Sequence, residues 1–531
     1  MSFRILVTDP LSEQGLAQLY AASDLEIVQE IGVSKEKLVE IIGDFDALLV
    51  RSQTKVTEEI IKAGSNLQVI GRAGVGVDNI DVRAATKAGV LVINAPDGNT
   101  ITTAEFTFAM MLALARHIPQ AHAKLKDGVW DRNRFVGVEL RGKHLSILGL
   151  GRIGAEVAKR AQAFGMHVTA YDPYLTPTRA EKLGIKAATL EEAIRTADFL
   201  TVHTPLSKET HHLISDEQFH MMKPGVRILN CARGGIIDEG ALARALEQGI
   251  VAGAALDVYE QEPAVGQPLL AFPQVISTPH LGASTEEAQV NVAVDVAQGV
   301  VDLLHGRSYP HTVNLPSLAP EQRAILEPFS NLGEVLGSFA AQLFRGGVHR
   351  VTIQYEGEPT QHATDPISRS TLRGILSRYY REEVHLISVA LIAEEMGIEV
   401  TETKLPPHGG YTNVIRVTLT GANEEVTVAG TVLKGHGMRI IQIDHYPVDI
   451  TPSSAMLMTW HRDRPGIIGR VGSVLGLAGI NIASMQVGRA IEGGEALMLM
   501  AVDRSVSDES VQAIRDAADM ERVAYIELPI A

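Results

Sequence analysis

Cysteine is almost absent from the sequence, and long apolar segments are absent altogether. Cys231 is the single cysteine among 531 residues, so no internal disulfide bond can form. This composition is compatible with a reducing cytosol, and we expect a cytoplasmic protein. No run reaches the roughly 18 apolar residues that a membrane-spanning helix needs. Residues 3–9 have a strand pattern and lack the basic start and apolar block of a signal peptide.

An excess of positive charge is also missing. The 47 lysines and arginines are outnumbered by 63 aspartates and glutamates, which gives a formal net charge of −16. An acidic chain repels nucleic acids and anionic membranes, so we expect neither as a partner. An anionic substrate therefore has to be held by arginines gathered at one place. We expect no metal site.

The sequence does have enough apolar content for several cores. Hydrophobic residues make up 45% of the chain, and its length predicts roughly three or four domains. In the first third, short apolar runs alternate with helical stretches, which predicts a parallel sheet with crossover helices. The expected strands are residues 5–7, 47–50, 69–70 and 90–93, and the expected helices are 12–22, 34–42 and about 103–118.

A second alternating series starts near residue 145 and predicts a dinucleotide-binding domain. Six strands with helical connections are what such a domain needs. The expected strands are residues 145–148, 168–171, 199–203, 227–230, 253–256 and 275–277. A helical stretch at 286–304 follows, and Pro310, Pro316 and Pro320 then mark a linker.

Beyond residue 325 the pattern changes to a helix followed by alternating strands, without a catalytic constellation. The helix is expected to extend to residue 343, and the strands to lie at 348–355, 414–419, 426–433 and 439–443. Thr451 and Pro452 mark another boundary. The last part of the chain alternates as strand, helix, strand, strand, helix, strand, a ferredoxin-like pattern. Its expected elements are residues 455–460, 467–478, 480–487, 495–502, 508–518 and 523–528.

A glycine motif lies between an expected strand and an expected helix. Gly149, Gly151 and Gly154 fit the pattern G-x-G-x-x-G, with Arg152 and Ile153 inside it. The first glycine permits a tight turn, the second lets the backbone approach a pyrophosphate, and the third allows close helix–strand packing. Phosphates then sit at the helix N-terminus, where unpaired N–H groups attract anions. The alternative interpretation is a tight strand–helix turn without a ligand.

Asp172 lies at the end of the next expected strand, at about the spacing of 20 residues that such a domain requires. A carboxylate at this place can accept hydrogen bonds from both ribose hydroxyls and would repel a 2′-phosphate. Pro173 and Tyr174 follow, with no adjacent arginine. The sequence therefore favours NAD over NADP, the alternative being an ordinary surface aspartate.

Three polar side chains, those of Arg233, Glu262 and His280, each follow an expected strand at the edge where open α/β sheets bind ligands. Removal of hydride from a C2–H requires loss of the hydroxyl proton, and histidine titrates near neutral pH. A carboxylate can orient the ring, and a guanidinium can grip a substrate carboxylate in a fork. The alternatives are a structural or solvated histidine, surface carboxylates and an arginine that caps a strand. Cys231 is expected to be packed rather than redox-active.

Residues 149–154, 230–238, 257–263 and 278–282 together resemble the D-isomer-specific 2-hydroxyacid dehydrogenase family. The resemblance implies an α/β fold in which a Rossmann cofactor domain is inserted into a flavodoxin-like substrate domain. It implies catalysis by Arg233, Glu262 and His280, with NAD as cofactor. The NAD-binding residues expected on this basis are Gly149, Gly151, Arg152, Ile153, Gly154, Asp172, Thr204, Cys231, Ala232, Arg233, Asp257, His280 and Gly282.

The resemblance extends to the long members of the family, which carry an α+β intervening domain and a ferredoxin-like ACT regulatory domain. We therefore expect a substrate domain at residues 1–97 and 285–316, with the NAD-binding domain at 98–284 between them. The intervening domain, similar to one that binds an allosteric substrate, is expected at 317–452, and the ACT domain at 453–531. These members are homo-oligomers, so we expect a dimer or tetramer.

Arginines after two N-terminal strands point to the substrate. Arg51 and Arg72 each follow an expected strand, and Asn99 follows a turn near the cleft. A triply charged phosphoglycerate needs cationic ligands beyond Arg233, and the long family members have arginines at the two matching places. They also borrow basic residues from a neighbouring subunit, for which Arg132 and Arg134 are the candidates. The alternative is that these arginines simply face solvent.

The resemblance thus implies NAD-dependent oxidation of 3-phosphoglycerate to 3-phosphohydroxypyruvate, which leads to L-serine. In the ACT domain, His461, Asp463 and Asn481 match places that bind a small amino acid, here serine as regulator. A purely structural dimerisation module is the alternative for that domain. Two other functions remain open, a glyoxylate or hydroxypyruvate reductase and a non-catalytic NAD sensor of the same fold.

Overall fold

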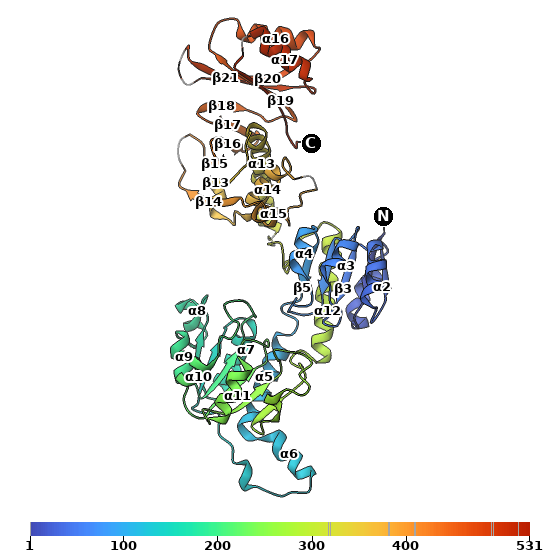
Figure 1. Ribbon diagram of the computed structural model, residues 1–531, viewed down its shortest axis with the longest axis vertical. Helices are drawn as coiled ribbons and strands as arrows, with labels where there is room; N and C mark the ends of the chain where they lie inside the picture. The colour runs from blue at the N-terminus through green and yellow to red at the C-terminus, as the bar shows by residue number, and fades with distance from the viewer. Residues whose placement is uncertain are drawn as a thin grey trace.

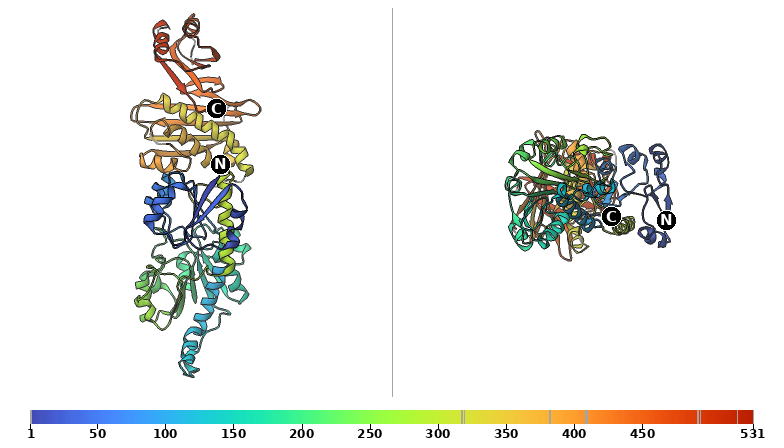
Figure 2. Two further views of the ribbon diagram at one scale, coloured as in Figure 1. Left: turned by 90° about the vertical axis from the view of Figure 1, so that its right-hand side faces the viewer. Right: turned by 90° about the horizontal axis from the view of Figure 1, so that it is seen from below.

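Four β-sheets with their helices are stacked into an elongated molecule in this computed structural model (Figures 1 and 2). The described residues are 2–316, 318, 320–380, 383–407, 410–489, 491, 493–518 and 520–530. Three of the expected domain limits, Met1, Ser317 and Ala531, lie outside them. No helix among the described residues is long and apolar enough to cross a membrane.

The N-terminal sheet is parallel, with the strand order β2-β1-β3-β4-β5 that is typical of flavodoxin-like folds. Its strands are β1 (Phe3–Val7), β2 (Leu25–Gln29), β3 (Ala47–Val50), β4 (Val69–Arg72) and β5 (Leu91–Asn94). Its helices are α1 (Glu13–Ala21), α2 (Lys35–Ile41), the 3₁₀ turn η1 (Ile42–Asp44), α3 (Glu58–Ala63) and α4 (Val82–Lys87). The central strand β3 is fully buried, whereas the edge strand β2 is half-buried and was not predicted.

A long C-terminal helix of this unit returns from far along the chain. Helix α12 (Glu286–Leu304) packs on α1 and β4, and the Gln18 side chain donates a hydrogen bond to the Val294 carbonyl over 2.6 Å. Gly71 makes the packing possible, because a Cβ there would lie 2.6 Å from a methyl group of Val296. The second sheet is therefore inserted between β5 and α12, as the family resemblance implied.

The inserted sheet is also parallel, with the order β12-β11-β10-β9-β6-β7-β8. Its strands are β6 (His144–Leu148), β7 (His167–Tyr171), β8 (Lys186–Ala187), β9 (Phe199–Val202), β10 (Val226–Asn230), β11 (Val251–Leu256) and β12 (Val275–Ser277). Read from β8, this is the Rossmann order with one added strand, and the order reverses between β6 and β9, where dinucleotides bind. The predicted Rossmann fold is confirmed, and only the short edge strand β8 was missed.

Helices cover both faces of the inserted sheet. They are α5 (Thr100–Arg116), α7 (Arg152–Ala163), α8 (Pro177–Lys182), α9 (Leu190–Thr196), α10 (Asp216–Met221), α11 (Glu239–Glu247) and η3 (Pro268–Ala271). Two further elements, α6 (Ile118–Lys126) and η2 (Asn133–Phe135), have no buried residues. Helix α6 and the chain after it project as an arm at the lower end of the molecule in Figure 1. The sheet core, by contrast, is buried against α5 and α7.

The third sheet is mixed, with the order β14-β13-β15-β16-β17-β18 and a single parallel pair, β13 with β14, among its described strands. Its strands are β13 (Arg350–Gly357), β14 (Glu399–Leu405), β15 (Asn413–Thr420), β16 (Glu425–Leu433), β17 (Gly437–Ile443) and β18 (Tyr446–Ile450). The helices are α13 (Pro320–Leu343), η4 (Glu358–Gln361), α14 (Asp365–Leu376) and α15 (Val389–Glu395). On α15, Glu395 forms ion pairs with Lys87 (2.9 Å) and Arg83 (3.5 Å) of α4, which tie this unit to the N-terminal sheet.

The fourth sheet is antiparallel, with the ferredoxin-like order β20-β21-β19-β22. Its elements are β19 (Ala455–Arg462), α16 (Ile467–Leu477), β20 (Ile482–Arg489), β21 (Glu495–Val502), α17 (Asp508–Ala518) and β22 (Arg522–Glu527). Met456 and Leu497 belong to the same buried cluster as Tyr446 of the third sheet. The last two sheets therefore share one hydrophobic core.

Candidate active site

The glycine loop between β6 and α7 has the geometry that the motif predicted. Gly149 has φ = +94°, and a Cβ there would lie 2.7 Å from the His203 carbonyl oxygen. A Cβ on Gly154 would lie 2.3 Å from the carbonyl oxygen of Gly149. At Gly151, in contrast, a Cβ would point into open space. The loop is thus closed on its protein side and open where a pyrophosphate approaches the N-terminus of α7.

Asp172 follows β7 directly and lies beside the glycine loop. One carboxylate oxygen accepts a hydrogen bond from the Leu150 N–H and the other from the Tyr174 N–H, both over 2.8 Å. Each oxygen keeps a lone pair, because a carboxylate offers about four acceptor positions. The side chain can therefore fix the loop and still receive ribose hydroxyls, an arrangement that fits NAD.

Buried polar atoms without a partner line the same crevice after β9. Among the described residues, neither the Thr204 hydroxyl oxygen nor His203 Nδ1 has a hydrogen-bond partner, although both are buried. Burial lowers the pKa of His203 to about 4, so its ring is neutral. Since buried polar groups are normally satisfied, these atoms mark a surface built to face another polar group.

Two other expected cofactor residues, Arg152 and Cys231, differ in their surroundings. Arg152, the first residue of α7, forms an ion pair with Asp97 over 2.6 Å, and both side chains are more than half exposed. Cys231 is buried, and burial raises the pKa of its thiol to about 12. The thiol therefore stays protonated, in agreement with the expectation that it packs rather than reacts.

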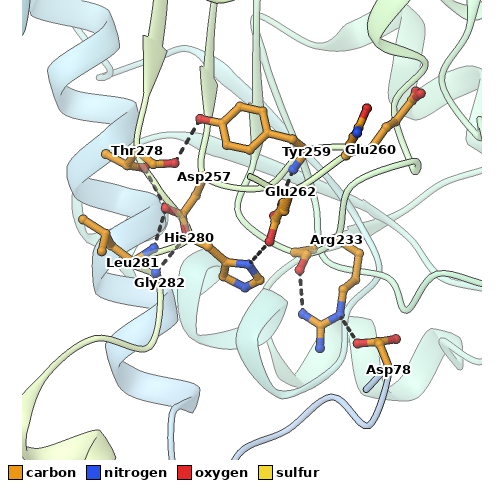
Figure 3. A network of polar contacts seen from close by, with 12 residues as sticks. Asp78, Arg233, Asp257, Tyr259, Glu260, Glu262, Thr278, His280, Leu281 and Gly282 are labelled. Carbon is orange, nitrogen blue, oxygen red and sulfur yellow. Dashed lines mark hydrogen bonds and ion pairs between the residues drawn. The ribbon is translucent and has the colours of Figure 1, made fainter. Parts of the chain in front are cut away.

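The structure brings His280 and Glu262 together, as Figure 3 shows. His280 Nδ1 lies 2.9 Å from Glu262 Oε2, and the other carboxylate oxygen accepts a hydrogen bond from the Tyr259 N–H over 3.2 Å. A carboxylate only accepts hydrogen bonds, so Nδ1 carries the proton and Nε2 is left as the acceptor. The pair is half-exposed and can take a proton from a bound hydroxyl.

Asp257, expected among the cofactor residues, contacts the His280 loop (Figure 3). It is 1% exposed and accepts hydrogen bonds from the Thr278 hydroxyl (2.6 Å), the Leu281 N–H (2.7 Å) and the Gly282 N–H (2.8 Å). This anchor holds His280 at φ = +56°, an uncommon backbone conformation for a residue with a side chain. Sequence reasoning did not find this role, because its partners lie more than 20 residues away.

Arg233 sits opposite the histidine pair, on the turn after β10. Its carbonyl oxygen accepts a hydrogen bond from the Asn230 side-chain amide over 2.8 Å, and its guanidinium Nη1 donates to the Ala232 carbonyl over 2.7 Å. Its Nε forms an ion pair with Asp78, which lies on the turn after β4, over 3.2 Å. The guanidinium therefore spans the gap between the two N-terminal sheets.

Three arginines gather at this gap. Val50, the last residue of β3, pairs with Arg72 of β4, so Arg51 lies beside Arg72. Burial, together with the nearby cations Arg233 and Arg51, lowers the pKa of Arg72 to about 10, against the opposing charges of Asp78 and Asp9. The Arg72 Nε is buried without a hydrogen-bond partner among the described residues. Such a cluster favours an anion.

Asp9, which sequence reasoning missed, positions the Arg51 turn. It is 1% exposed and accepts hydrogen bonds from the Arg51 N–H (2.6 Å), the Thr54 N–H (3.1 Å) and the Thr54 hydroxyl (2.6 Å). These local donors hold the Asp9 carboxylate in place. A polar residue directly after β1, at the ligand-binding edge, was the available signal.

The remaining expected substrate residues separate into two groups. Asn99 begins α5 next to the cleft, and its side-chain oxygen is buried without a partner among the described residues. Arg132 and Arg134 are exposed at η2, in the segment after α6 that projects as an arm (Figure 1). Within one chain, these two arginines do not join the cluster.

A pocket of about 530 Å³ opens beside the histidine pair. Glu262 and His280 line it together with Tyr259, Pro263, Val265 and Leu270. A polar pair beside apolar walls is the usual composition of a small-molecule site. In the described residues, no group of three His, Cys, Asp or Glu side chains is arranged to hold a metal ion.

The three residues expected to bind a regulator are engaged within the fourth sheet. His461 is 3% exposed, and burial lowers its pKa. Asp463 forms an ion pair with Arg489 over 2.8 Å. The Asn481 side chain donates a hydrogen bond to Asp503 over 2.8 Å.

Comparison with known proteins agrees with this geometry. Residues 108–282 match the NAD-binding domain of the D-isomer-specific 2-hydroxyacid dehydrogenases, residues 325–444 the D-3-phosphoglycerate dehydrogenase intervening domain, and residues 455–519 the ACT domain. The first match, with the Rossmann crevice and the His280–Glu262 pair, defines an NAD-dependent oxidoreductase of the 2-hydroxyacid dehydrogenase class.

The relatives make the assignment more specific. The chain is 46% identical to D-3-phosphoglycerate dehydrogenase of Bacillus subtilis over 99% of its own length and 100% of the relative, and 45% identical to that of Methanocaldococcus jannaschii with the same coverage. The crystal structure of Aquifex aeolicus D-lactate dehydrogenase in complex with NAD and lactic acid is similar with a TM-score of 0.53 at 28% identity. The similarity covers 59% of this chain and 100% of the Aquifex aeolicus chain. The chain belongs to the D-3-phosphoglycerate dehydrogenase family.

Proposed function

We propose that the protein oxidises 3-phosphoglycerate to 3-phosphohydroxypyruvate with NAD, a step that supplies L-serine synthesis. The observation that carries this proposal is the gathering of Arg51, Arg72 and Arg233 beside the His280–Glu262 pair. A 2-hydroxy acid with one carboxylate needs one guanidinium, whereas a phosphorylated one brings further charge that the other two arginines match. The names of the full-length relatives agree with it.

Arg233 holds the substrate carboxylate in this proposal, and Arg51 and Arg72 hold the phosphate. Asn99, with its buried and unpaired side-chain oxygen, faces a substrate hydroxyl. The charges then pair across a narrow gap, and the substrate is oriented with its C2 atom toward His280.

His280 removes the proton of the C2 hydroxyl at Nε2, because Nδ1 already donates to Glu262. The Glu262 carboxylate stabilises the imidazolium that forms, and the Tyr259 N–H keeps that carboxylate in place. NAD, when bound, accepts the hydride from C2. Loss of one hydride and one proton converts the 2-hydroxy acid into the 2-oxo acid.

The chain's residues hold the cofactor along the crevice between β6 and β9. Asp172 receives the ribose hydroxyls, and the glycine loop with Arg152 faces the pyrophosphate. Asp257 keeps the His280 loop at the nicotinamide end. The other proposed contacts are Gly149, Gly151, Ile153, Gly154, Thr204, Cys231, Ala232, Arg233, His280 and Gly282.

The finer points of organisation are also proposals. We place the substrate domain at 1–97 and 285–316, the NAD-binding domain at 98–284, the intervening domain at 317–452 and the ACT domain at 453–531. Serine acts through the ACT domain in a cytoplasmic dimer or tetramer. Arg132 and Arg134 then contribute to the site of a second copy, which their place on the projecting arm allows.

A panel of 2-hydroxy acids and 2-oxo acids, assayed with NAD or NADH at equal concentrations, tests the proposal. We expect the highest kcat/KM for 3-phosphoglycerate and its oxidation product. Preference for glyoxylate or hydroxypyruvate would identify a different reductase of the same fold. No turnover of any compound would point to a non-catalytic NAD sensor.

A further inference from the structure

Asp78 occupies one side of the Arg233 guanidinium (Figure 3). Its carboxylate lies 3.2 Å from Nε, while Nη1 donates to the Ala232 carbonyl and Nη2 faces Gly76. A guanidinium grips a carboxylate through two parallel N–H groups, and one of its two such edges includes Nε. That edge is filled by a side chain of the protein itself.

Asp78 lies close to the other arginines as well. Asp78 and Arg233 are both among the charges that act on Arg72, and Arg51 acts on it from the neighbouring strand end. An anion that binds Arg233 through the Nε edge therefore meets the Asp78 carboxylate. The two carboxylates, that of the substrate and that of Asp78, cannot both occupy this edge.

The two partners of the ion pair differ in how firmly they are held. The Arg233 side chain is 29% exposed, and hydrogen bonds to Asn230 and Ala232 fix its turn. The Asp78 side chain is 72% exposed and lies on a turn outside the regular elements. Displacement of the pair therefore moves Asp78 into solvent and leaves Arg233 in place.

We propose that Asp78 is an internal counter-ion that competes with the substrate carboxylate for Arg233. It keeps the three arginines partly neutralised and aligned, and it yields its place when an anionic substrate enters. Asp78 is a positioning residue that sets substrate affinity without contact with the reacting atoms. This inference rests on the proposed function, because Arg233 is taken as the carboxylate ligand.

The experiment compares the full-length wild type with Asp78→Asn, Asp78→Glu and the control Glu58→Gln, which removes a charge that is paired with Lys62 on the surface of α3. The Michaelis constant and kcat are measured for 3-phosphoglycerate with NAD. The inhibition constant is measured for oxamate, a small monoanion with a carboxylate next to a carbonyl. Oxamate carries no phosphate, so it reports on the carboxylate site alone.

We expect Asp78→Asn to lower the Michaelis constant by up to about five-fold, the range of an exposed ion pair, with a smaller change in kcat. The oxamate inhibition constant should fall by the same factor. Asp78→Glu keeps the charge and should lie closer to the wild type, and Glu58→Gln should match it.

An unchanged or increased Michaelis constant in Asp78→Asn would overturn the proposal, because Asp78 would then support Arg233 instead of competing for it. An improvement for 3-phosphoglycerate without one for oxamate would also overturn it, since the charge would act through the phosphate. If the wild type oxidises a different 2-hydroxy acid, the proposed substrate is wrong. The oxamate measurement still decides the role of Asp78 in that case.

Discussion

Arg72 is charged at a cost to the stability of the N-terminal sheet, so a neutral side chain of similar length should stabilise the folded chain. Burial and the neighbouring arginines lower its pKa from 12.5 to about 10, which corresponds to about 3 kcal/mol. Water around the exposed part of the side chain reduces this to about 2 kcal/mol. Arg72→Met should therefore raise the free energy of unfolding by that amount, or the Tm by roughly 4–8 °C.

The sign follows from proton binding. Between pH of about 10 and 12.5 the unfolded chain binds more protons at Arg72 than the folded chain does, so wild-type stability rises with pH there. Below this window the guanidinium is charged in both states, and the full cost is present at neutral pH. The gain from Arg72→Met should thus be complete at pH 7.

The assay is thermal unfolding at pH 7, with and without 3-phosphoglycerate. Arg4→Met is the matched control in the same sheet, because Arg4 is paired with Glu26 over 3.2 Å and lies 4.6 Å from the Phe45 ring centre. We expect the control to lose up to about 1 kcal/mol, and Arg72→Met to lose the ligand-induced increase in Tm. An Arg72→Met variant less stable than the wild type would refute the conclusion that the buried charge of Arg72 destabilises the fold.

The other expected outcomes concern four parts of the molecule. His280→Ala should lower kcat by roughly 10²–10⁴-fold while NADH binding, followed by fluorescence, is retained, and Glu262→Gln should move the acidic limb of the pH–rate profile to lower pH. Asp172→Ala should weaken NAD binding and relax the preference over NADP in kcat/KM measurements; equal use of both cofactors by the wild type would remove the basis for this role. Because burial lowers the pKa of His203 from 6.5 to about 4, its contribution to stability is complete above pH 6.5 and is lost as the pH falls toward 4, and His203→Gln should flatten this dependence in denaturant titrations. Serine should inhibit the wild type but not Asn481→Ala, with calorimetry as the direct test; no heat and no change in kinetics at millimolar serine would leave the ACT domain as an assembly element.

Elements with a strong local signal were predictable from the sequence. Strand β3 is a continuous apolar run because both faces are buried, and α12 was predicted at its observed bounds. The glycine loop was predictable because a backbone with φ near +94° and a close carbonyl neighbour requires glycine at fixed spacing. Arg233, Glu262 and His280 were chosen as catalytic candidates because each follows a predicted strand.

Contacts between distant segments were not predictable in this way. Strand β2 lies at a sheet edge, so it lacks the apolar run of a buried strand. Asp9, Asp78 and Asp257 act through partners that only the fold brings near, and an aspartate after a strand has no local mark of that role. Helices α14 and α15 were also missed, although most residues of both are buried.

Because the third and fourth sheets share a hydrophobic core, they form one rigid unit. Met456 and Leu497 of one sheet are packed with Tyr446 of the other, so the two cannot tilt separately without opening apolar surface to water. This unit is joined to the N-terminal sheet by the ion pair between Glu395 and Lys87. The same ion pair places the third sheet against α4, the helix that follows the Asp78 turn. Deletion of residues 453–531 would remove Met456, Met458, Leu497, Leu499, Ile526 and Leu528 from the shared cluster. Single-residue variants are therefore the cleaner way to test the role of the fourth sheet.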